Sequence, residues 1–593
     1  KLTIIFFTVQ KVFDIMWLNA NTIERTGKMN KFAKIVSIAS AMLIVSTTGL
    51  SVSAAKVDTL ESKNSSEIAI PFTGEGTTLD VDENLPSSYS SKDLNLVTPI
   101  RQQGNAQICW AYGGLSSLET LLIKDGVIDN SSNSWYSAAH VDAWGTPRKD
   151  GTGWQREYYK GGGFPYITMG YLSSWSGGVS ENEFPYTSPL SLFDINKKYN
   201  INNVVTGIMY LDSEDKDTIK KSIKDYGAVT THYNEYSRFS ADDTHSYCPG
   251  ASNYINGHCI SVVGWDDNIS KESFTVNIDG ETYTPKKDGA WLCRNSWGDY
   301  NDFDGYFWIS YEDYYIFSDV FGPSYAFTDY MKNNVSNTIH QVETFGATYE
   351  FDYLDEASKD TTYINVLNID NTNEYLNKVM FESTSVGANY TLYYIPVDNE
   401  GTPSSDKTTW KTLKTGKVPY SGYYTADVDP LYVSKGKIGI GVEIDTTDTK
   451  AINGIGVSEW LENKDERIFN TEAKRGQSYI YTDKNIFPNI PSLSKSKVND
   501  VMDFYEDVND DTEGGNFVIK GITYKRGTLV GDANLDGVVN IEDAVCIQKS
   551  TIHSYTLSSE GQINADINQN GVVNVKDVTE IQRLLAKVTG DNQ

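Results

Sequence analysis

Three residues of the sequence carry the functional groups that a thiol-dependent acyl transfer needs. Cys109 lies within the stretch QQGNAQICWAYGG, His258 within NGHCISVVGW, and Asn295 at the start of an Asn-Ser-Trp-Gly stretch. A cysteine thiolate is a nucleophile, an imidazole exchanges protons with the leaving amine, and an amide orients that imidazole. A single histidine is more often structural, but the three stretches in this order favour catalysis.

Cys109 must sit where its thiolate is favoured. The apolar positions that follow it at three- and four-residue steps are Tyr112, Leu115, Leu118 and Leu122. This spacing predicts a helix that begins at or near Cys109, and Gly126 is a plausible cap at its end. Unpaired N–H groups and the helix dipole at that end favour the thiolate. An inert buried thiol remains the alternative.

The other cysteines and histidines receive no catalytic role. Five cysteines in 593 residues cannot make a disulfide scaffold, and at most two bridges are possible. We expect Cys248, Cys259 and Cys293 to be structural, with the last two in strands beside catalytic residues, and Cys546 to be a core thiol.

The composition restricts the class of protein. The chain has 39% apolar residues, a formal net charge of −29 and a pI of about 4.6. Its length suits several folded domains. The acidic balance argues against nucleic acid or an anionic membrane surface as the main partner.

The N-terminal residues read as a targeting segment. From Met29, two lysines precede an apolar run that ends in the small residues Ser53-Ala54-Ala55. This pattern predicts a signal peptide at 29–55, and therefore a secreted, extracellular protein without a membrane span. We expect residues 1–28 to lie upstream of the true start, and 56–84 to be a linker or short pro-segment.

Three regions follow that differ in composition and in hydrophobic pattern. Residues 85–328 are rich in Trp, Tyr and Gly, and 335–524 show short alternating strands typical of a β-sandwich. Residues 528–590 contain an internal duplication. The predicted fold is multidomain: an α+β catalytic domain, an all-β sandwich and a small all-α calcium-binding domain.

The duplication predicts two calcium loops. DANLDGVVNIED begins at Asp532 and DINQNGVVNVKD at Asp566, and each places a glycine sixth, where a calcium loop turns sharply. The closing residue is Asp rather than Glu, so bidentate closure is not assured. The predicted ligands of two Ca²⁺ ions are Asp532, Asn534, Asp536, Val538, Asn540, Asp543, Asp566, Asn568, Asn570, Val572, Asn574 and Asp577.

The duplicated region resembles a dockerin module. In that family each loop leads into a helix, and the pair of helices docks onto a cohesin domain of a scaffold protein. The stretches AVCIQKSTI and VTEIQRLLAKV would supply those helices. The resemblance implies that the cohesin contacts are Ile541, Glu542, Gln548, Lys549, Val575, Lys576, Gln582 and Arg583.

Residues 85–328 resemble a papain-family (C1) cysteine peptidase. The stretch from Leu85 to Tyr112, the Gly-rich stretch GGGFPYITMGYLSSW, and the His and Asn-Ser-Trp stretches carry the resemblance. It implies that Cys109 is the nucleophile, His258 the base and acid, and Asn295 the orienting residue. The remaining implied roles are an oxyanion donor at Gln103, a shield at Trp297, and substrate-backbone binding at Gly162 and Gly163.

The sequence departs from the family pattern at three places. Ala106 stands where the family has its first cysteine, so the family disulfide to the glycine segment cannot form. The stretch SKESFTVNIDGETYTPKKDGA, between His258 and Asn295, reads as an inserted hairpin. The region between the predicted cleavage site and Leu85 is too short for the family's helical propeptide, which leaves open whether activation requires proteolysis.

Residues 335–524 resemble the lectin-like sandwich that follows the catalytic domain in bacterial members. Carbohydrate binding and a packing or spacer role are both open. Together the regions predict a secreted cysteine endopeptidase that acts on proteins or peptides, attached by its dockerin to a cellulosome-type scaffold. The alternative is a catalytically silent adhesion or carbohydrate-binding component.

Overall fold

The computed structural model describes residues 76–79, 84–253, 255–333, 336–351, 361–447, 454–459, 461–463, 466–482, 497–508, 514–525, 529–536, 538–568 and 570–590. The expected upstream start, the signal peptide and most of segment 56–84 lie outside these residues. Among the described helices, none combines the length and apolar character that crossing a membrane requires.

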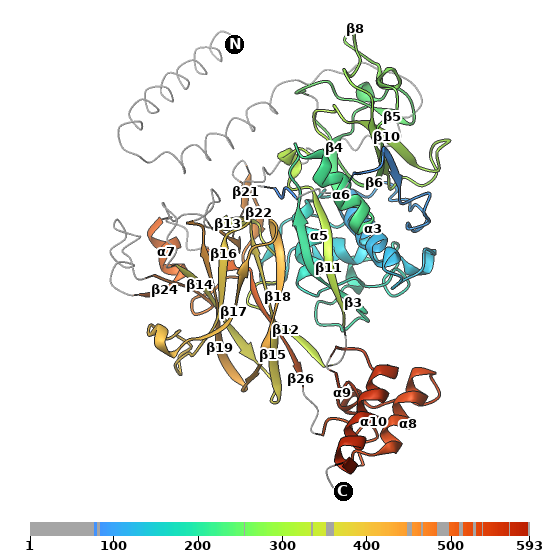
Figure 1. Ribbon diagram of the computed structural model, residues 1–593. Coiled ribbons are helices and arrows are strands. Elements are labelled where there is room, and N and C mark those ends of the chain that lie inside the picture. The colour runs from blue at the N-terminus through green and yellow to red at the C-terminus, as the bar shows by residue number, and fades with distance from the viewer. Residues whose placement is uncertain are drawn as a thin grey trace. The chain divides into compact units, whose positions relative to one another are not determined.

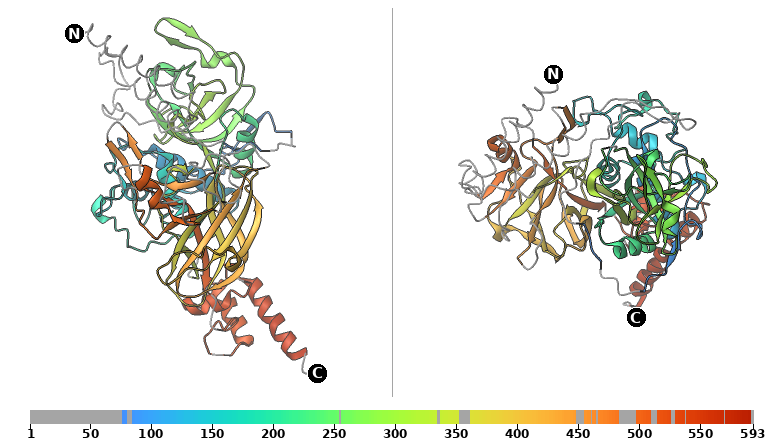
Figure 2. Two further views of the ribbon diagram at one scale, coloured as in Figure 1. Left: turned by 90° about the vertical axis from the view of Figure 1, so that its left-hand side faces the viewer. Right: turned by 90° about the horizontal axis from the view of Figure 1, so that it is seen from above.

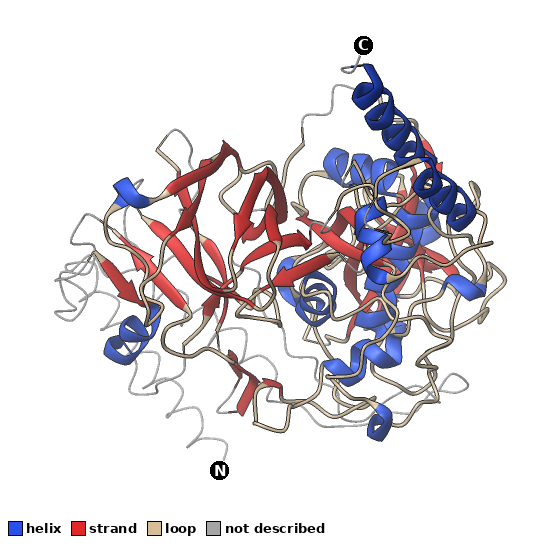
Figure 3. Ribbon diagram, turned by 90° about the horizontal axis from the view of Figure 1, so that it is seen from below, coloured by secondary structure: helices blue, strands red, loops and turns tan. Residues whose placement is uncertain are grey.

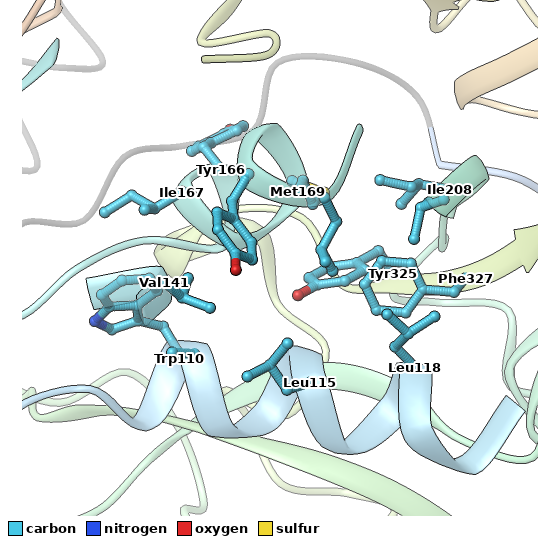
Figure 4. Close-up of a cluster of buried hydrophobic side chains, with 14 of the residues drawn as sticks. Trp110, Leu115, Leu118, Val141, Tyr166, Ile167, Met169, Ile208, Tyr325 and Phe327 are labelled. Atoms are coloured by element: carbon cyan, nitrogen blue, oxygen red, sulfur yellow. The ribbon is translucent and has the colours of Figure 1, made fainter. Parts of the chain in front are cut away.

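The helix predicted from Cys109 is α3 (Cys109–Lys124), and every residue from Cys109 to Leu122 is buried. Gly126 has φ +70° and follows the helix end, where its N–H bonds to the Ile123 carbonyl. This left-handed glycine satisfies the terminal carbonyls and stops the helix. Figure 4 shows Trp110, Leu115 and Leu118 projecting from α3 into a buried apolar cluster.

Two further helices, α4 (Ala138–Trp144) and α5 (Pro165–Ser173), contribute to that cluster, alongside residues of strands and loops. Pro165 occupies the first turn of α5, where its missing N–H costs nothing. Figure 4 shows Tyr166 and Met169 of α5 pointing toward α3. The two helices therefore flank α3 on the side away from the sheet.

A sheet that is antiparallel except for the β5–β10 pair supports the other side of α3. Its strands in order are β3 (Asn203–Tyr210), β11 (Tyr325–Lys332), β4 (Val229–Asn234), β6 (Gly257–Asp266), β9 (Ala290–Arg294) and β10 (Tyr306–Ser310), with β1 (Ser88–Ser90) on β6 and β5 (His245–Ser246) on β10. Ile260 and Val262 pack with α6 (Lys216–Tyr226) on the opposite face. Successive side chains of a strand point to opposite faces of the sheet. Alternate residues of β6 therefore pack against α3 on one face and α6 on the other.

The predicted insertion forms a hairpin of β7 (Val276–Ile278) and β8 (Glu281–Tyr283), paired antiparallel. The hairpin extends away from strands β6 and β9 (Figures 1 and 2). All three residues of β8 are exposed. An exposed two-stranded insertion of this kind leaves the sheet that carries His258 and Asn295 intact.

Region 335–524 is a β-sandwich, as predicted. One sheet orders β12 (Asn337–His340), β26 (Ile519–Lys525), β15 (Glu374–Ser383) and β18 (Gly422–Val433); the other orders β17 (Lys411–Lys417), β16 (Asn389–Ile395), β19 (Gly436–Asp445), β14 (Thr362–Ile369), β23 (Ser478–Tyr481) and β24 (Val498–Asp500). Apolar side chains of both sheets, such as Val379 and Ile440, share one core.

The first sheet of the sandwich continues into the sheet of region 85–328. Tyr423 of β18 pairs with Ile208 of β3, so the strands form one continuous ladder. The short elements that complete the sandwich region are β13 (Tyr349–Phe351), β20 (Ile455–Ser458), β21 (Leu461–Asn463), β22 (Glu466–Asn470), α7 (Val501–Val508) and β25 (Asn516–Phe517), and β22 pairs with β2 (Gly153–Trp154) of region 85–328. The sequence did not predict that the pairing of β18 with β3 joins the two regions in one sheet.

Residues 529–590 contain the two helices that the duplication predicts, α8 (Ile541–Thr551) and α10 (Val575–Gly590), with α9 (Ser559–Ala565) between them. Figure 3 shows this part of the chain as helices joined by loops. The core that they share consists of Ala533, Ala544, Ile547, Leu557, Ala565, Val578 and Ile581. The short helix α9 was not predicted.

Candidate active site

The thiol of Cys109 lies at the first residue of α3. The first turn of this helix contains no acidic residue, so no carboxylate offsets its positive end. Cys109 is 5% exposed, and Trp110, which follows it, is 1% exposed. The position fits the thiolate-favouring site that the sequence predicted.

One glycine brings the helix close to the strand that carries His258. A Cβ on Gly113 would lie 2.8 Å from the sulfur of Cys259, the neighbour of His258 on β6. The Ser261 hydroxyl also donates to the Gly113 carbonyl at 3.1 Å. Because Gly113 is one helical turn after Cys109, this contact fixes the start of α3 against β6.

The imidazole of His258 is oriented by Asn295. Its Nε2 lies 2.9 Å from Asn295 Oδ1, an amide oxygen that also accepts the Ser296 N–H at 2.7 Å. An oxygen only accepts, so Nε2 carries the proton and Nδ1 is left as the basic nitrogen. Burial lowers the pKa of His258 to about 4, and the bond to Asn295 opposes that fall.

Aromatic rings enclose this pair. The Trp297 ring lies 4.7 Å from the His258 ring, centroid to centroid, and Tyr233 on β4 approaches from another side at 5.9 Å. The Asn295 Nδ2 donates to the Tyr300 hydroxyl at 3.3 Å. Trp297 therefore lies where the predicted shield of the His–Asn hydrogen bond belongs, whereas the Tyr300 contact was not predicted.

Gln103 is fixed by five hydrogen bonds, one of which its carbonyl accepts from the Ala106 N–H at 3.2 Å. Its backbone N–H donates to the Ser296 carbonyl at 2.8 Å, and its Oε1 accepts the Ser296 hydroxyl at 2.5 Å. Its Nε2 donates to the Ala106 carbonyl at 2.8 Å, and its carbonyl accepts the Tyr186 hydroxyl. The amide nitrogen has a second hydrogen, which can serve an oxyanion. The sequence analysis missed Ser296 and Tyr186.

The two glycines expected to hold the substrate backbone lie beside Trp110. Gly162 has φ +58°, which favours glycine, and a Cβ on Gly163 would lie 2.3 Å from the Trp110 ring. Any larger side chain at 163 would displace the residue next to Cys109. The structure thus explains both glycines by backbone shape and packing, while substrate binding there stays a prediction.

The remaining cysteines do not resemble nucleophiles. All five are thiols in the structure. Cys259 and Cys293 are buried on β6 and β9, as expected, and burial raises the pKa of Cys293 well above its usual value. Burial likewise raises the pKa of Cys248 to about 12. Cys546 is half-buried at the edge of the core of residues 529–590.

The calcium-loop residues form two matching hydrogen-bond networks. Asp543 accepts N–H bonds from Ala533 and Asn534 through one oxygen and from Asn540 through the other. The corresponding carboxylate of the second loop, Asp577, accepts from Ile567, Asn568 and Asn574 in the same pattern. Asp543 and Asp577 therefore hold the backbone of their loops in a closed turn.

Two further observations bear on these loops. The Oδ1 atoms of Asn540 and Asn574 accept the N–H groups of Glu542 and Lys576, so they cap the following helices. Across the described residues no three His, Cys, Asp or Glu side chains gather as a metal site. Calcium there would need the Asn oxygens and backbone carbonyls as well. Gly537 lies outside the described residues.

The predicted cohesin contacts are accessible. Ile541 is 55% exposed and Val575 is 64% exposed, at equivalent positions of the two repeats. The other six predicted residues, all exposed, are Glu542, Gln548, Lys549, Lys576, Gln582 and Arg583. Two exposed branched apolar side chains at helix starts are typical of a binding surface rather than a core.

Three family models match the chain in succession. The papain family cysteine protease model matches residues 85–321, the lectin-like domain model 339–523, and the dockerin type I domain model 530–586. Among curated proteins, bovine cathepsin S is 25% identical over 225 residues and rat procathepsin L 23% over 233. These matches cover 37% and 38% of this chain but only 58% and 60% of those relatives.

A solved structure resembles more of the chain. The cysteine protease and lectin-like domains of Cwp84, a surface layer associated protein of Clostridium difficile, are 31% identical with a TM-score of 0.64. The likeness covers 77% of this chain and 93% of that one. A second structure of Cwp84, after propeptide cleavage, matches at 30% identity and a TM-score of 0.62, over 74% of this chain and 100% of that one. The chain therefore belongs to the papain family of cysteine proteases, with a lectin-like domain and a dockerin domain after the protease domain.

Proposed function

We propose that the chain is a cysteine endopeptidase that hydrolyses peptide bonds through Cys109, His258 and Asn295. The observation that carries the proposal is the 2.9 Å contact between His258 Nε2 and Asn295 Oδ1. It assigns the proton to Nε2 and leaves Nδ1 to accept the thiol proton.

The reaction is an acyl transfer in two halves. His258 Nδ1 takes the Cys109 proton, and the thiolate attacks the peptide carbonyl carbon. The oxyanion receives hydrogen bonds from Gln103 Nε2 and the Cys109 N–H, because the first N–H groups of a helix have no acceptor within it. The imidazolium protonates the leaving amine. The neutral imidazole then activates water, which releases the acid and restores the thiol.

The dockerin domain would attach this enzyme to a cohesin-bearing scaffold of the cellulosome type. Each loop would hold one Ca²⁺ through the oxygen ligands predicted above, and the donors fit because hard oxygens suit that ion. Bound calcium supplies a cross-link within each loop. It takes no part in the peptidase reaction. We propose the domain bounds 85–328, 335–524 and 528–590 and an extracellular location.

A peptide-library digest tests the peptidase. The full chain from residue 56 onward is incubated with mixed peptides under reducing conditions, beside the Cys109→Ala variant. We expect new peptide ends from the parent chain and none from the variant. Absence of cleavage, even after residues before Leu85 are trimmed, would contradict the proposal. Glycan binding by residues 335–524 would then be the next test, because it distinguishes an adhesion component.

A further inference from the structure

The glycine segment, residues 157–163, packs against Trp110, the neighbour of Cys109, yet it contains no cysteine through which a disulfide could anchor it. Ala106 stands at the position where the resemblance implies a cysteine, and all five cysteines of the chain are thiols. Glycine-rich backbone loses much conformational entropy when it is ordered. Something else must hold this segment in place.

Arg156 bonds the glycine segment to the structure around it. Its Nε donates to the Gly162 carbonyl at 2.5 Å, and its Nη1 lies 2.6 Å from Asp142 Oδ1. The centre of its guanidinium lies 5.0 Å from the Trp110 ring. Its side chain is only 6% exposed. One buried cation therefore contacts the glycine segment, α4 and the residue after Cys109.

Asp142 ties the other end of the segment. Its side chain is fully buried on α4, and its Oδ2 accepts the Tyr159 N–H at 2.7 Å. The Tyr159 carbonyl in turn accepts the Gln107 N–H at 2.8 Å, two residues before Cys109. The segment is thus bonded to the loop that precedes the nucleophile, on the side where the family disulfide would lie.

Because Arg156 and Asp142 are both buried, each charge needs the other to compensate it. Removal of one member of a buried ion pair leaves the other charge uncompensated, which costs more than an exposed pair would. Desolvation raises the pKa of Asp142, and the charge of Arg156 opposes the rise. Figure 4 shows Val141, the neighbour of Asp142 on α4, beside the Trp110 ring. Arg156, the other member of the pair, therefore lies against the same ring as the glycine segment.

We propose that Arg156, paired with Asp142, is a positioning residue that holds the glycine segment in the shape that binds an extended substrate backbone. The inference rests on the proposed peptidase function. The pair takes the place in this chain of the missing covalent link. It sets where the Gly162 and Gly163 backbone lies relative to Trp110, and it does not touch the reacting atoms.

Kinetics separate positioning from chemistry. The Arg156→Lys and Asp142→Asn variants of the full chain are compared with Arg148→Lys. Arg148 makes an ion pair of the same length with Glu472, 2.6 Å, in a less buried place, and its Nη2 donates to Thr344 rather than to the glycine segment. For a peptide that extends several residues before the cleaved bond, we expect a fall in kcat/KM of about tenfold or more in the first two variants, mainly through KM. Alkylation of Cys109 by iodoacetamide should change less than about twofold, because the pair does not touch the thiol. The control should keep parental values.

Hydrogen exchange tests the same inference without turnover. We expect faster amide exchange in residues 157–164 of both variants, with β6 amides as protected as in the parent. Unchanged exchange there with unchanged KM would overturn the inference. Equal loss of protection in β6 would also overturn it, because Arg156 would then stabilise the fold in general. A parent chain without turnover would refute the proposed function, while the exchange pattern would still decide the role of Arg156.

Discussion

Ser296 holds Gln103 at two points: its hydroxyl donates to Gln103 Oε1 at 2.5 Å, and its carbonyl accepts the Gln103 N–H at 2.8 Å. The neighbouring Asn295 binds His258. The residue that orients the oxyanion donor therefore adjoins the residue that orients the base. A shift of this short stretch would move both groups at once.

The Ser296→Ala variant should have a lower kcat although Cys109 itself is unaffected. Removal of the hydroxyl frees the Gln103 amide to rotate, and one lost hydrogen bond of about 1 kcal/mol corresponds to roughly a fivefold fall in kcat. KM should stay near the parental value, because the oxyanion exists only in the transition state. Steady-state kinetics on one cleaved peptide measure this. An unchanged kcat would contradict the role assigned to Ser296.

The Asn295→Ala variant should shift the pH dependence of activity. The hydrogen bond from His258 to Asn295 raises the pKa of the imidazole, against the larger lowering by burial. Its loss should therefore lower the pKa of His258 further, and the acid limb that this residue governs should move to lower pH. We also expect kcat to fall about tenfold to a hundredfold, because the imidazole loses its orientation. A pH–rate profile measures both effects, and a shift to higher pH would contradict the assignment.

His140 should make the folded chain sensitive to acid. Burial lowers its pKa to about 3, and four aromatic side chains surround it: Tyr171, Phe184, Phe193 and Tyr199. Because the folded pKa lies below the unfolded value near 6.5, the unfolded state binds the extra proton between these values. Stability is therefore lost as the pH falls below about 6.5, by roughly 2–3 kcal/mol near pH 4.5.

Replacement of this histidine isolates its share. His140→Gln should give a smaller decrease in melting temperature between about pH 6.5 and 4.5 than the parent chain shows. A single-site comparison is needed because burial raises the pKa of Asp313 to about 6, which acts in the opposite sense. An equal decrease in both proteins would show that His140 does not titrate on unfolding.

Calcium removal should affect the dockerin domain alone. Without the ion, the carboxylates of each loop repel one another, so we expect chelation to lower the helical circular dichroism from α8 and α10. Asp532→Ala and Asp566→Ala should each lower calcium affinity at one loop about tenfold or more, measured by calorimetry. Peptide cleavage should persist in chelator. If chelation abolished peptide cleavage together with the helical signal, the peptidase domain would depend on calcium, which would contradict this prediction.

The sequence predicted what depends on local pattern. The start of α3 at Cys109, the two dockerin helices and the sandwich follow from apolar spacing and from turn residues. The Ser296–Gln103 bonds join residues 193 positions apart, and the Arg156–Asp142 pair joins a loop to α4 across 14 positions; none of these residues has a distinctive sequence pattern of its own. The pairing of β18 with β3 was also beyond prediction, because strand partners across domains leave no periodic signal. Such contacts become visible only when the fold brings the segments together.

The most direct test of the account is the stoichiometry of covalent labelling at Cys109. The full chain is treated with a peptidyl epoxide that inhibits papain-like enzymes, and intact-mass spectrometry and peptide mapping locate the adduct. The account predicts one adduct per chain, on Cys109, in proportion to the loss of activity, with none in Cys109→Ala or in unfolded protein. Labelling of another cysteine, or none on Cys109 in a folded chain, would contradict it.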